Sequence, residues 1–269
     1  MAMLAIAGSL GFTSCSDDNK DEPNGAGNGG ENQAVVANPS NVFTAGIPTK
    51  VGGMSVNTDA NGLVTSMGNA TDGVNITFTY PSLSRADGYD VIMQVEEDGD
   101  RNIFNLSLNE LGFTKYCRQI ESDGNVEEWW FEYNADGQLS KMTRSEGDNE
   151  VTSITYVNGN ITKVVGGGND PDSTNDYTIS YGSPLIENKG CIMLFDATFG
   201  IDMDEMEYAY FAGLLGKATK NLPIERIDSV DGDRGTYTWT LDSNGMPVKV
   251  EIVESGDGWS DSDTMEFNW

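Results

Sequence analysis

Carboxylates are the side chains of this sequence that could do the most varied chemistry. The chain has 43 Asp and Glu, 15 Lys and Arg and no His, which gives a formal net charge of −28. Without histidine, the sequence excludes a Ser-His-Asp triad, a Cys-His pair and a histidine-liganded zinc site. A pair of carboxylates can still hydrolyse a glycosidic bond. No two of the acids stand out, so the sequence assigns no catalytic residue.

Acidic loops are the candidate metal sites. Aspartates cluster within residues 170–176, 228–233 and 257–263, and Ca²⁺ prefers carboxylate oxygens on glycine-containing loops. None of the clusters has EF-hand spacing, so we expect solvated hairpin turns, with a Ca²⁺ site as the alternative and no other cofactor. The negative charge also argues against a nucleic-acid partner, because phosphate recognition depends on Lys and Arg.

Two tryptophans are the candidate ligand-binding residues. Trp130 stands between Glu128 and Glu132, and Trp259 lies in a stretch rich in Gly and Asp. An exposed Trp beside carboxylates can stack on a sugar ring, so both are predicted to contact a ligand. The alternative is that a neighbouring loop or helix partly buries them.

Three cysteines suggest two different roles. Small residues before Cys15, at the end of an apolar run of about 11 residues, resemble a bacterial lipobox, in which the cysteine carries the lipid. An ordinary cleaved signal with an incidental cysteine is the alternative. Cys117 and Cys191 could form a disulfide in an exported protein, closing a loop of 74 residues, or remain two free thiols.

The first forty residues are predicted to export and tether the chain. The apolar run is too short to span a membrane as a helix and suits the core of a signal peptide. Residues 1–15 are therefore expected to be a signal peptide and lipobox, and residues 16–40 a flexible acidic and Gly-rich linker. This predicts a protein anchored to the outer membrane by lipid. The acidic tether resembles the signal that exposes some lipoproteins on the cell surface.

Short polar turns recur through the rest of the chain. Their glycines are 22 to 26 residues apart: Gly62, Gly88, Gly112, Gly137, Gly159 and Gly182, with a similar turn at Gly245. Glycine supplies the positive φ that a hairpin turn needs, and a period near 24 residues corresponds to one hairpin. The segments between the turns alternate apolar and polar residues, which predicts roughly 14 to 16 antiparallel strands.

One segment breaks this alternation. Four apolar residues recur at helical spacing between residues 202 and 216: Met203, Met206, Tyr210 and Leu214. Asp202 suits the start of a helix and Gly216 its end. We predict one inserted helix here, which plugs the barrel or covers one opening, with its Met and aromatic side chains packed in the core.

The layout resembles a known family. Residues 134–141, 156–163 and 212–223, together with the lipobox and the acidic linker, resemble uncharacterised bacterial lipoproteins described as having a porin-like barrel fold, and the hairpins are similar to YD repeats. The resemblance covers residues 41–269 and implies a fold but no activity. Charged residues at outward strand positions argue against a lipid-facing band. We therefore expect an all-β, antiparallel, porin-like but soluble barrel as a single domain.

The expected function is a non-catalytic one. We predict a monomeric envelope module that binds a glycan, peptide or protein ligand. A hydrolase of polysaccharides that uses paired carboxylates and a purely structural envelope protein are the alternatives.

Overall fold

The computed structural model describes residues 36–69, 71, 73–81, 88–146, 149–168 and 174–269. The predicted signal peptide, Cys15 and most of the predicted linker lie outside these residues. The contacts divide the chain into Met1–Gln33 and Ala34–Trp269, and the second unit holds the barrel. Ala37 and Pro39 are already buried, so the last residues of the predicted linker pack with the barrel. No helix in the described part of the chain is long and apolar enough to cross a membrane.

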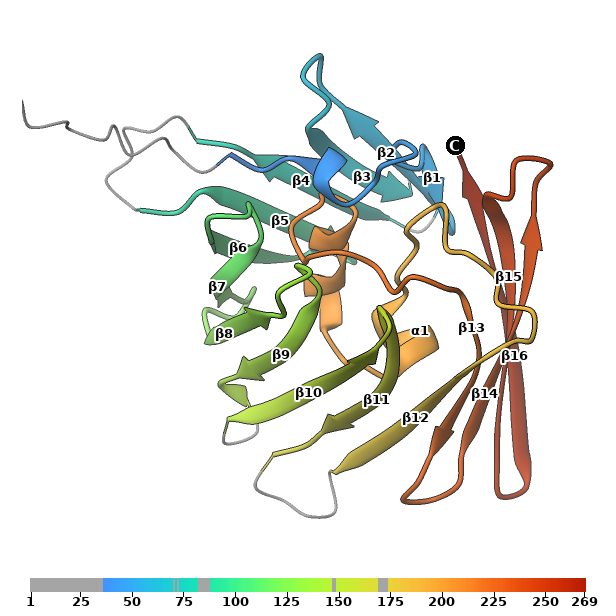
Figure 1. Ribbon diagram of the computed structural model, residues 1–269. Coiled ribbons are helices and arrows are strands. Elements are labelled where there is room, and N and C mark those ends of the chain that lie inside the picture. The colour runs from blue at the N-terminus through green and yellow to red at the C-terminus, as the bar shows by residue number, and fades with distance from the viewer. Residues whose placement is uncertain (1–35, 70, 72, 82–87, 147–148, 169–173) are drawn as a thin grey trace, which may run out of the picture. The chain divides into compact units, whose positions relative to one another are not determined.

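Sixteen antiparallel strands of the described residues form a closed barrel (Figure 1). The first eight are β1 (Lys50–Val51), β2 (Met54–Thr58), β3 (Val64–Asn69), β4 (Val74–Thr79), β5 (Val91–Glu97), β6 (Asp100–Leu108), β7 (Thr114–Ile120) and β8 (Val126–Tyr133). The others are β9 (Leu139–Arg144), β10 (Glu150–Val157), β11 (Asn160–Gly166), β12 (Asn175–Tyr181), β13 (Pro223–Asp228), β14 (Arg234–Leu241), β15 (Pro247–Gly256) and β16 (Trp259–Asn268). Each strand pairs with its sequence neighbours, and β1 pairs with β16. The predicted all-β antiparallel barrel is confirmed.

The polar turns close hairpins at one end of the barrel, which we name the turn end. In the turn between β2 and β3, the carboxylate of Asp59 accepts hydrogen bonds from the amides of Asn61 (2.8 Å) and Leu63 (2.9 Å), while Gly62 has φ 81°. In the turns at Gly112, Gly137 and Gly245, the side chain of the first turn residue likewise accepts hydrogen bonds from the amides two and four residues later. These first residues are Asn109, Asn134 and Asp242. These predicted turns are confirmed, except that residues 82–87, which precede Gly88, lie outside the described residues.

The predicted hairpin turn at Gly182 is wrong. After β12 the chain leaves the sheet and returns only at β13, which begins at Pro223 and pairs with β12. Residues 182–222 enter the barrel between these strands, and Gly182 is not among the glycines with positive φ. The period of the turns therefore stops where the insertion begins.

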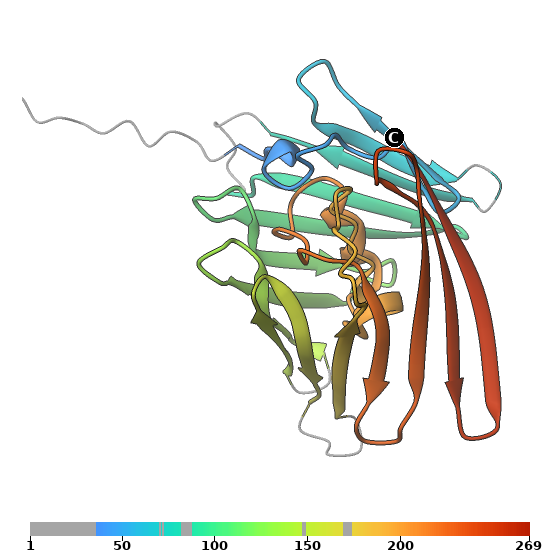
Figure 2. The same cartoon turned by 45° about the vertical axis from the view of Figure 1, so that its right-hand side comes forward.

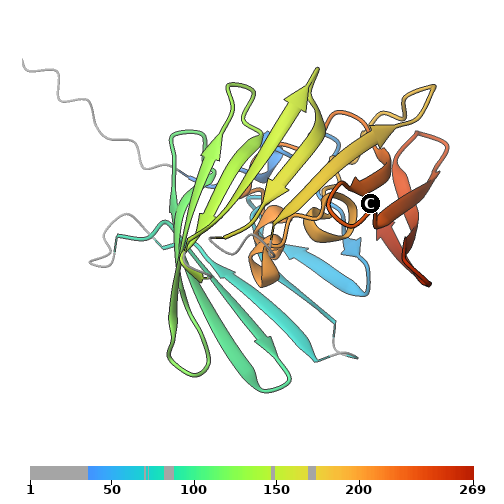
Figure 3. The same ribbon diagram turned by 90° about the horizontal axis from the view of Figure 1, so that it is seen from below.

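The inserted segment fills the barrel and is named the plug (Figures 2 and 3). It contains α1 (Phe195–Phe199) and the 3-10 helix η4 (Asp204–Tyr210), whereas the sequence predicted one helix over 202–216. Helical geometry stops early because Gly213 and Gly216 have φ 74° and 85°. A side chain at Gly213 would lie 2.5 Å from the Cα of Pro39, so this close approach requires glycine.

Most apolar side chains of the described strands face the interior of the barrel. The four apolar plug residues that the helical spacing singled out are at most 1% exposed, which confirms their predicted core position. On β8, Trp129 and Phe131 face the plug at 0% and 4% exposure, whereas Trp130 on the other face is 40% exposed. The alternation therefore directs the apolar side chains of the wall against the plug.

Candidate functional site

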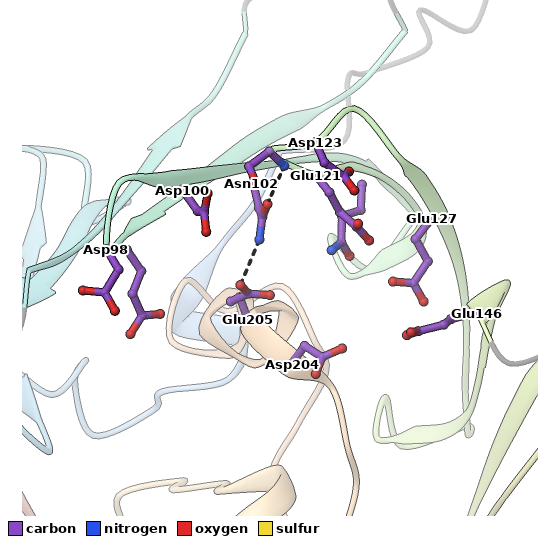
Figure 4. A pocket seen from close by; sticks show the side chains of 12 residues that line it. Asp98, Asp100, Asn102, Glu121, Asp123, Glu127, Glu146, Asp204 and Glu205 are labelled. Carbon is purple, nitrogen blue, oxygen red and sulfur yellow. Dashed lines mark hydrogen bonds between the residues drawn. The ribbon is translucent and has the colours of Figure 1, made fainter.

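An acidic pocket opens at the end of the barrel opposite the turn end (Figure 4). It has a volume of about 450 Å³, and nine of its twelve lining residues are carboxylates. Six come from the β5–β8 region: Glu97, Asp98, Asp100, Glu121, Asp123 and Glu127. Three come from elsewhere in the chain: Glu146 after β9, and Asp204 and Glu205 in η4 of the plug. The other three lining residues are Asn102, Gln119 and Ser122.

The plug and the wall are tied together beside this pocket. The side-chain amide of Asn102 on β6 donates a hydrogen bond to Glu205 in η4 at 2.9 Å. The oxygen of the same Asn102 accepts one from the backbone amide of Ser122, in the turn between β7 and β8, at 3.0 Å. One asparagine therefore fixes both the plug carboxylate and the neighbouring turn.

Arg144 lies behind the pocket and is the cation of the site. Its side chain is only 9% exposed, and its guanidinium lies over the Trp129 ring, 5.1 Å from the ring centroid. Five carboxylates surround it, at 3.3 Å for Glu127, 3.3 Å for Glu150, 3.1 Å for Asp204 and 3.7 Å for Asp202, with Glu146 also paired. Burial acts to lower the pKa of Arg144, but Asp204 and Glu127 outweigh it and raise that pKa. Arg144 therefore remains charged and holds the plug to the wall.

Glu127 is the most perturbed carboxylate of the pocket. Its side chain is 6% exposed, and burial raises its pKa to about 7 although Arg144 opposes the shift. Its Oε1 lies 3.3 Å from Nε of Arg144, yet neither atom has a hydrogen-bond partner. Glu127 is therefore a nearly buried carboxylate at the pocket wall that is partly protonated near neutral pH.

The carboxylates of the pocket are spread out and do not converge on one point. Among the described residues, no group of three or more Asp, Glu, Cys or His could hold a metal ion. The nine carboxylates nevertheless line one pocket, so their negative charges act on the same volume. This arrangement suits a ligand whose positive charges are separated along its length.

Neither of the two tryptophans predicted to contact a ligand lines the acidic pocket. Trp130 on β8 and Trp259 on β16 are 40% and 46% exposed, so both have accessible rings. The strand order places seven strands between β8 and β16 in either direction around the barrel, so the two side chains lie on opposite sides. Trp130 packs against Tyr116 on β7 at 5.8 Å between ring centroids.

Cys117 and Cys191 are free thiols, so the structure has the second of the two arrangements that the sequence allowed. Cys117 is fully buried on the inner face of β7, and Cys191 lies in the plug with a positive φ of 52°. Burial raises the pKa of both thiols. Of the acidic loops for which a Ca²⁺ site was the alternative to solvated turns, residues 170–173 lie outside the described residues.

The comparisons with known proteins agree with this fold. Residues 56–249, more than two thirds of the chain, match the family model described as a domain of unknown function (DUF4595) with porin-like fold. The chain belongs to this family. The DUF4595 chain is similar to a porin-like protein from Bacteroides uniformis ATCC 8492, with 19% identity, a TM-score of 0.60 and coverage of 80% of this chain and 88% of the other.

A second solved structure also resembles the DUF4595 chain. A porin-like protein from Bacteroides vulgatus ATCC 8482 has 11% identity and a TM-score of 0.56, with coverage of 83% of this chain and 98% of the other. At these identities the likeness establishes the fold. No curated protein matches the chain.

The phase of two charged residues in the sequence is a signal for this site. Glu127 is in phase with Trp129 and Phe131, which places an acid on the inner face of β8. Arg144 is in phase with Met142, which places a cation on the inner face of β9. A buried charge needs a partner, so an inward acid and an inward base on adjacent strands predict a buried ion pair.

Proposed function

We propose that this protein is a lipid-anchored, non-catalytic envelope module that binds an amine-bearing ligand in its acidic pocket. The observation that carries the proposal is that nine carboxylates from four parts of the chain line one pocket of about 450 Å³. Glu127, one of the nine, adds a second indication, because its nearly buried Oε1 has no hydrogen-bond partner. An ammonium group in the pocket would stabilise the ionised form of Glu127.

The ligand class follows from how the charge is distributed. The described carboxylates do not form a chelating group, which disfavours a bare divalent ion. A linear polyamine places ammonium groups several ångströms apart and matches spread carboxylates. Such binding weakens with salt, because the partners remain partly solvated.

The inner and outer surfaces of the barrel support binding at the pocket rather than conduction through the lumen. The plug fills the interior with side chains such as Met206 and Leu214, both 0% exposed. A membrane-spanning barrel needs an apolar outer band on its strands. The face of β14 opposite the buried Tyr237 carries Thr236, Thr238 and Thr240. These observations favour a barrel with a polar outer face, and the proposed N-terminal lipid would hold it at the membrane.

The anchor rests on the lipobox-like residues before Cys15. The described chain enters the barrel at the turn end, where the carbonyl of Leu111 accepts a hydrogen bond from Asn41 at 3.5 Å. The acidic pocket lies at the opposite end. Mass spectrometry of the Cys15→Ala variant should show loss of the acyl mass and release to the soluble fraction, whereas continued membrane retention would contradict the anchor.

Calorimetric titration with spermine at low salt tests the ligand class. The wild-type protein should bind, and a variant with Asp100→Asn and Glu121→Gln in the pocket should bind on the order of tenfold more weakly. The matched control replaces Asp136 by Asn and Glu110 by Gln in exposed turns at the turn end, with the same change in net charge. Equal affinities for the two variants, or no binding by the wild type, would refute the proposal.

A polysaccharide hydrolase is the second candidate, and one observation favours it. A pKa of about 7 would let Glu127 act as a general acid near neutral pH, opposite a second pocket carboxylate as base. Release of reducing sugars from exported polysaccharides, lost in Glu127→Gln, would support catalysis. Turnover without stoichiometric amine binding would replace our proposal with this one.

A further inference from the structure

One long strand of the barrel has a free edge. β16 pairs with β15 from Trp259 to Glu266, but with β1 only through Phe267 and Asn268, because β1 consists of Lys50 and Val51. The carbonyl of Glu266 also accepts a hydrogen bond from Gly52, at 2.9 Å. No strand of the described residues pairs with Trp259–Met265 on this side.

The backbone groups on that edge can be identified from the register. The carbonyls of Glu266 and Asn268 accept hydrogen bonds from the β1 side. In an antiparallel sheet, alternate residues direct their backbone groups to the same side. The amide and carbonyl groups of Ser260, Ser262 and Thr264 therefore point to the free edge, which is where an added strand would bond.

Two aspartate side chains accept hydrogen bonds from backbone amides on this edge. The backbone amide of Ser262 donates to Asp261 Oδ1 at 2.8 Å, and that of Thr264 donates to Asp263 Oδ1 at 2.7 Å. Carboxylates on an edge strand oppose unspecific pairing with other chains. Neither aspartate has an ion pair among the described residues, so both charges are free for a cation of a partner.

The aspartates form a row with the tryptophan that the sequence singled out. Trp259, Asp261 and Asp263 are in phase on one face of β16, and all three are exposed. The acid opposite Asp261 on β15 is Glu254, which is already paired with Arg226 at 2.6 Å. The row therefore offers two unpaired carboxylates and an aromatic face, which attract Lys or Arg side chains by ion pairing and cation–π contact.

We propose that the free edge of β16 binds an extended basic peptide segment as an added strand, with Lys or Arg at alternate positions facing the Trp259–Asp261–Asp263 row. Its backbone bonds to Ser260, Ser262 and Thr264, and the aspartates exchange the edge amides for the basic side chains. Strand addition of this kind uses backbone bonds for affinity and alternate side chains for specificity. A second copy of this chain fits poorly, because it would bring its own Asp261 and Asp263 and a net charge of −28 to the same edge.

The site is separate from the acidic pocket. The pocket is built by β5–β9 and the plug, whereas the free edge belongs to β16, on the opposite side of the barrel from β8. A test of one site therefore leaves the other intact.

The probe is a synthetic peptide of alternating Lys and Thr, measured by titration calorimetry and by hydrogen exchange of the β16 amides. We expect binding, with slower exchange at Ser262 and Thr264. Binding should be lost for a peptide N-methylated at its threonines, because those amides would face β16. It should also be lost for a peptide of alternating Glu and Thr. The double variant Asp261→Asn with Asp263→Asn should bind the Lys-Thr peptide on the order of tenfold more weakly.

Ser262→Pro gives a variant that should fold normally, because the amide that it removes points away from β15. It should abolish the slower exchange of the Thr264 amide that the Lys-Thr peptide causes, whereas Asp100→Asn with Glu121→Gln in the pocket should leave that slower exchange unchanged. If the N-methylated peptide binds equally well, electrostatic adsorption alone explains the binding and the proposal is overturned. Concentration-dependent self-association that Ser262→Pro abolishes would assign the edge to a second copy and also overturn it.

Discussion

The barrel has two acidic regions on opposite sides, and they use their carboxylates differently. At the pocket, the nearly buried Arg144 forms ion pairs with five carboxylates of the wall and the plug. On β16, Asp261 and Asp263 have no cation among the described residues and instead accept hydrogen bonds from the exposed edge of their own strand. The same residue types therefore join the wall to the plug in one region and, among the described residues, have no ion pair in the other.

The largest effect is expected at the centre of the first region. Arg144→Met should lower the free energy of unfolding by about 3–5 kcal/mol, because it leaves Glu127 and Asp204 without their buried cation. Urea denaturation measures the change. The matched control is Arg101→Met, an exposed arginine 3.9 Å from Glu96, which should cost about 0–1 kcal/mol. A comparable loss for the two variants would remove the distinction between the regions.

The dependence of stability on pH should be the next largest effect. Burial raises the pKa of Glu127 from 4.5 to about 7, so the folded state holds a proton that the unfolded state has lost between these values. The free energy of unfolding should therefore fall as the pH rises from about 4.5 to about 7.

The variant Glu127→Gln separates this contribution from the rest of the chain. Between pH 5.5 and 8, it should lose less stability than the wild type, by on the order of 2 kcal/mol. A part of the slope should remain, because burial also raises the pKa of Glu207 in η4 to about 7. Thermal melts of both proteins across this range provide the measurement. Parallel profiles would show that Glu127 is ionised in the folded protein well below neutral pH.

The smallest effect is expected in the second region. Asp261→Asn with Asp263→Asn should change the free energy of unfolding by no more than about 0.5 kcal/mol, because both residues are exposed and Asn can still accept from the edge amides. Urea denaturation beside Arg144→Met compares the two regions directly. A loss of several kcal/mol would mean that these aspartates are structural.

The fold could be predicted from the sequence because its signals are local. Asp59 and Asn134 bond the amides of their own turns, and glycine three residues later supplies the positive φ, so no distant residue is needed. The core position of Met206 and Tyr210 could also be predicted, from their helical spacing. The exact form of the plug could not be predicted. The helical geometry ends near Gly213, where the backbone comes close to Pro39, a residue far away in the chain.

The pocket depends on barrel closure and on the path of the plug. Asn102 and Glu205 are 103 residues apart in the chain, and Arg144 and Asp204 are 60 apart. Only the inward phase of Glu127 and Arg144 on adjacent strands indicated that a charged group lay inside. The free edge of β16 was equally hidden, because it depends on the short length of β1.

Nuclear magnetic resonance of the protein titrated with spermine tests the central claim most directly. The side-chain amides of Gln119 and Asn102 line the acidic pocket, whereas those of Asn41 and Asn244 lie at the turn end. We predict saturable shifts for Gln119 and Asn102 at low salt, with Asn41 and Asn244 unmoved. Equal shifts at both ends, or none at the pocket, would contradict an amine-binding site there.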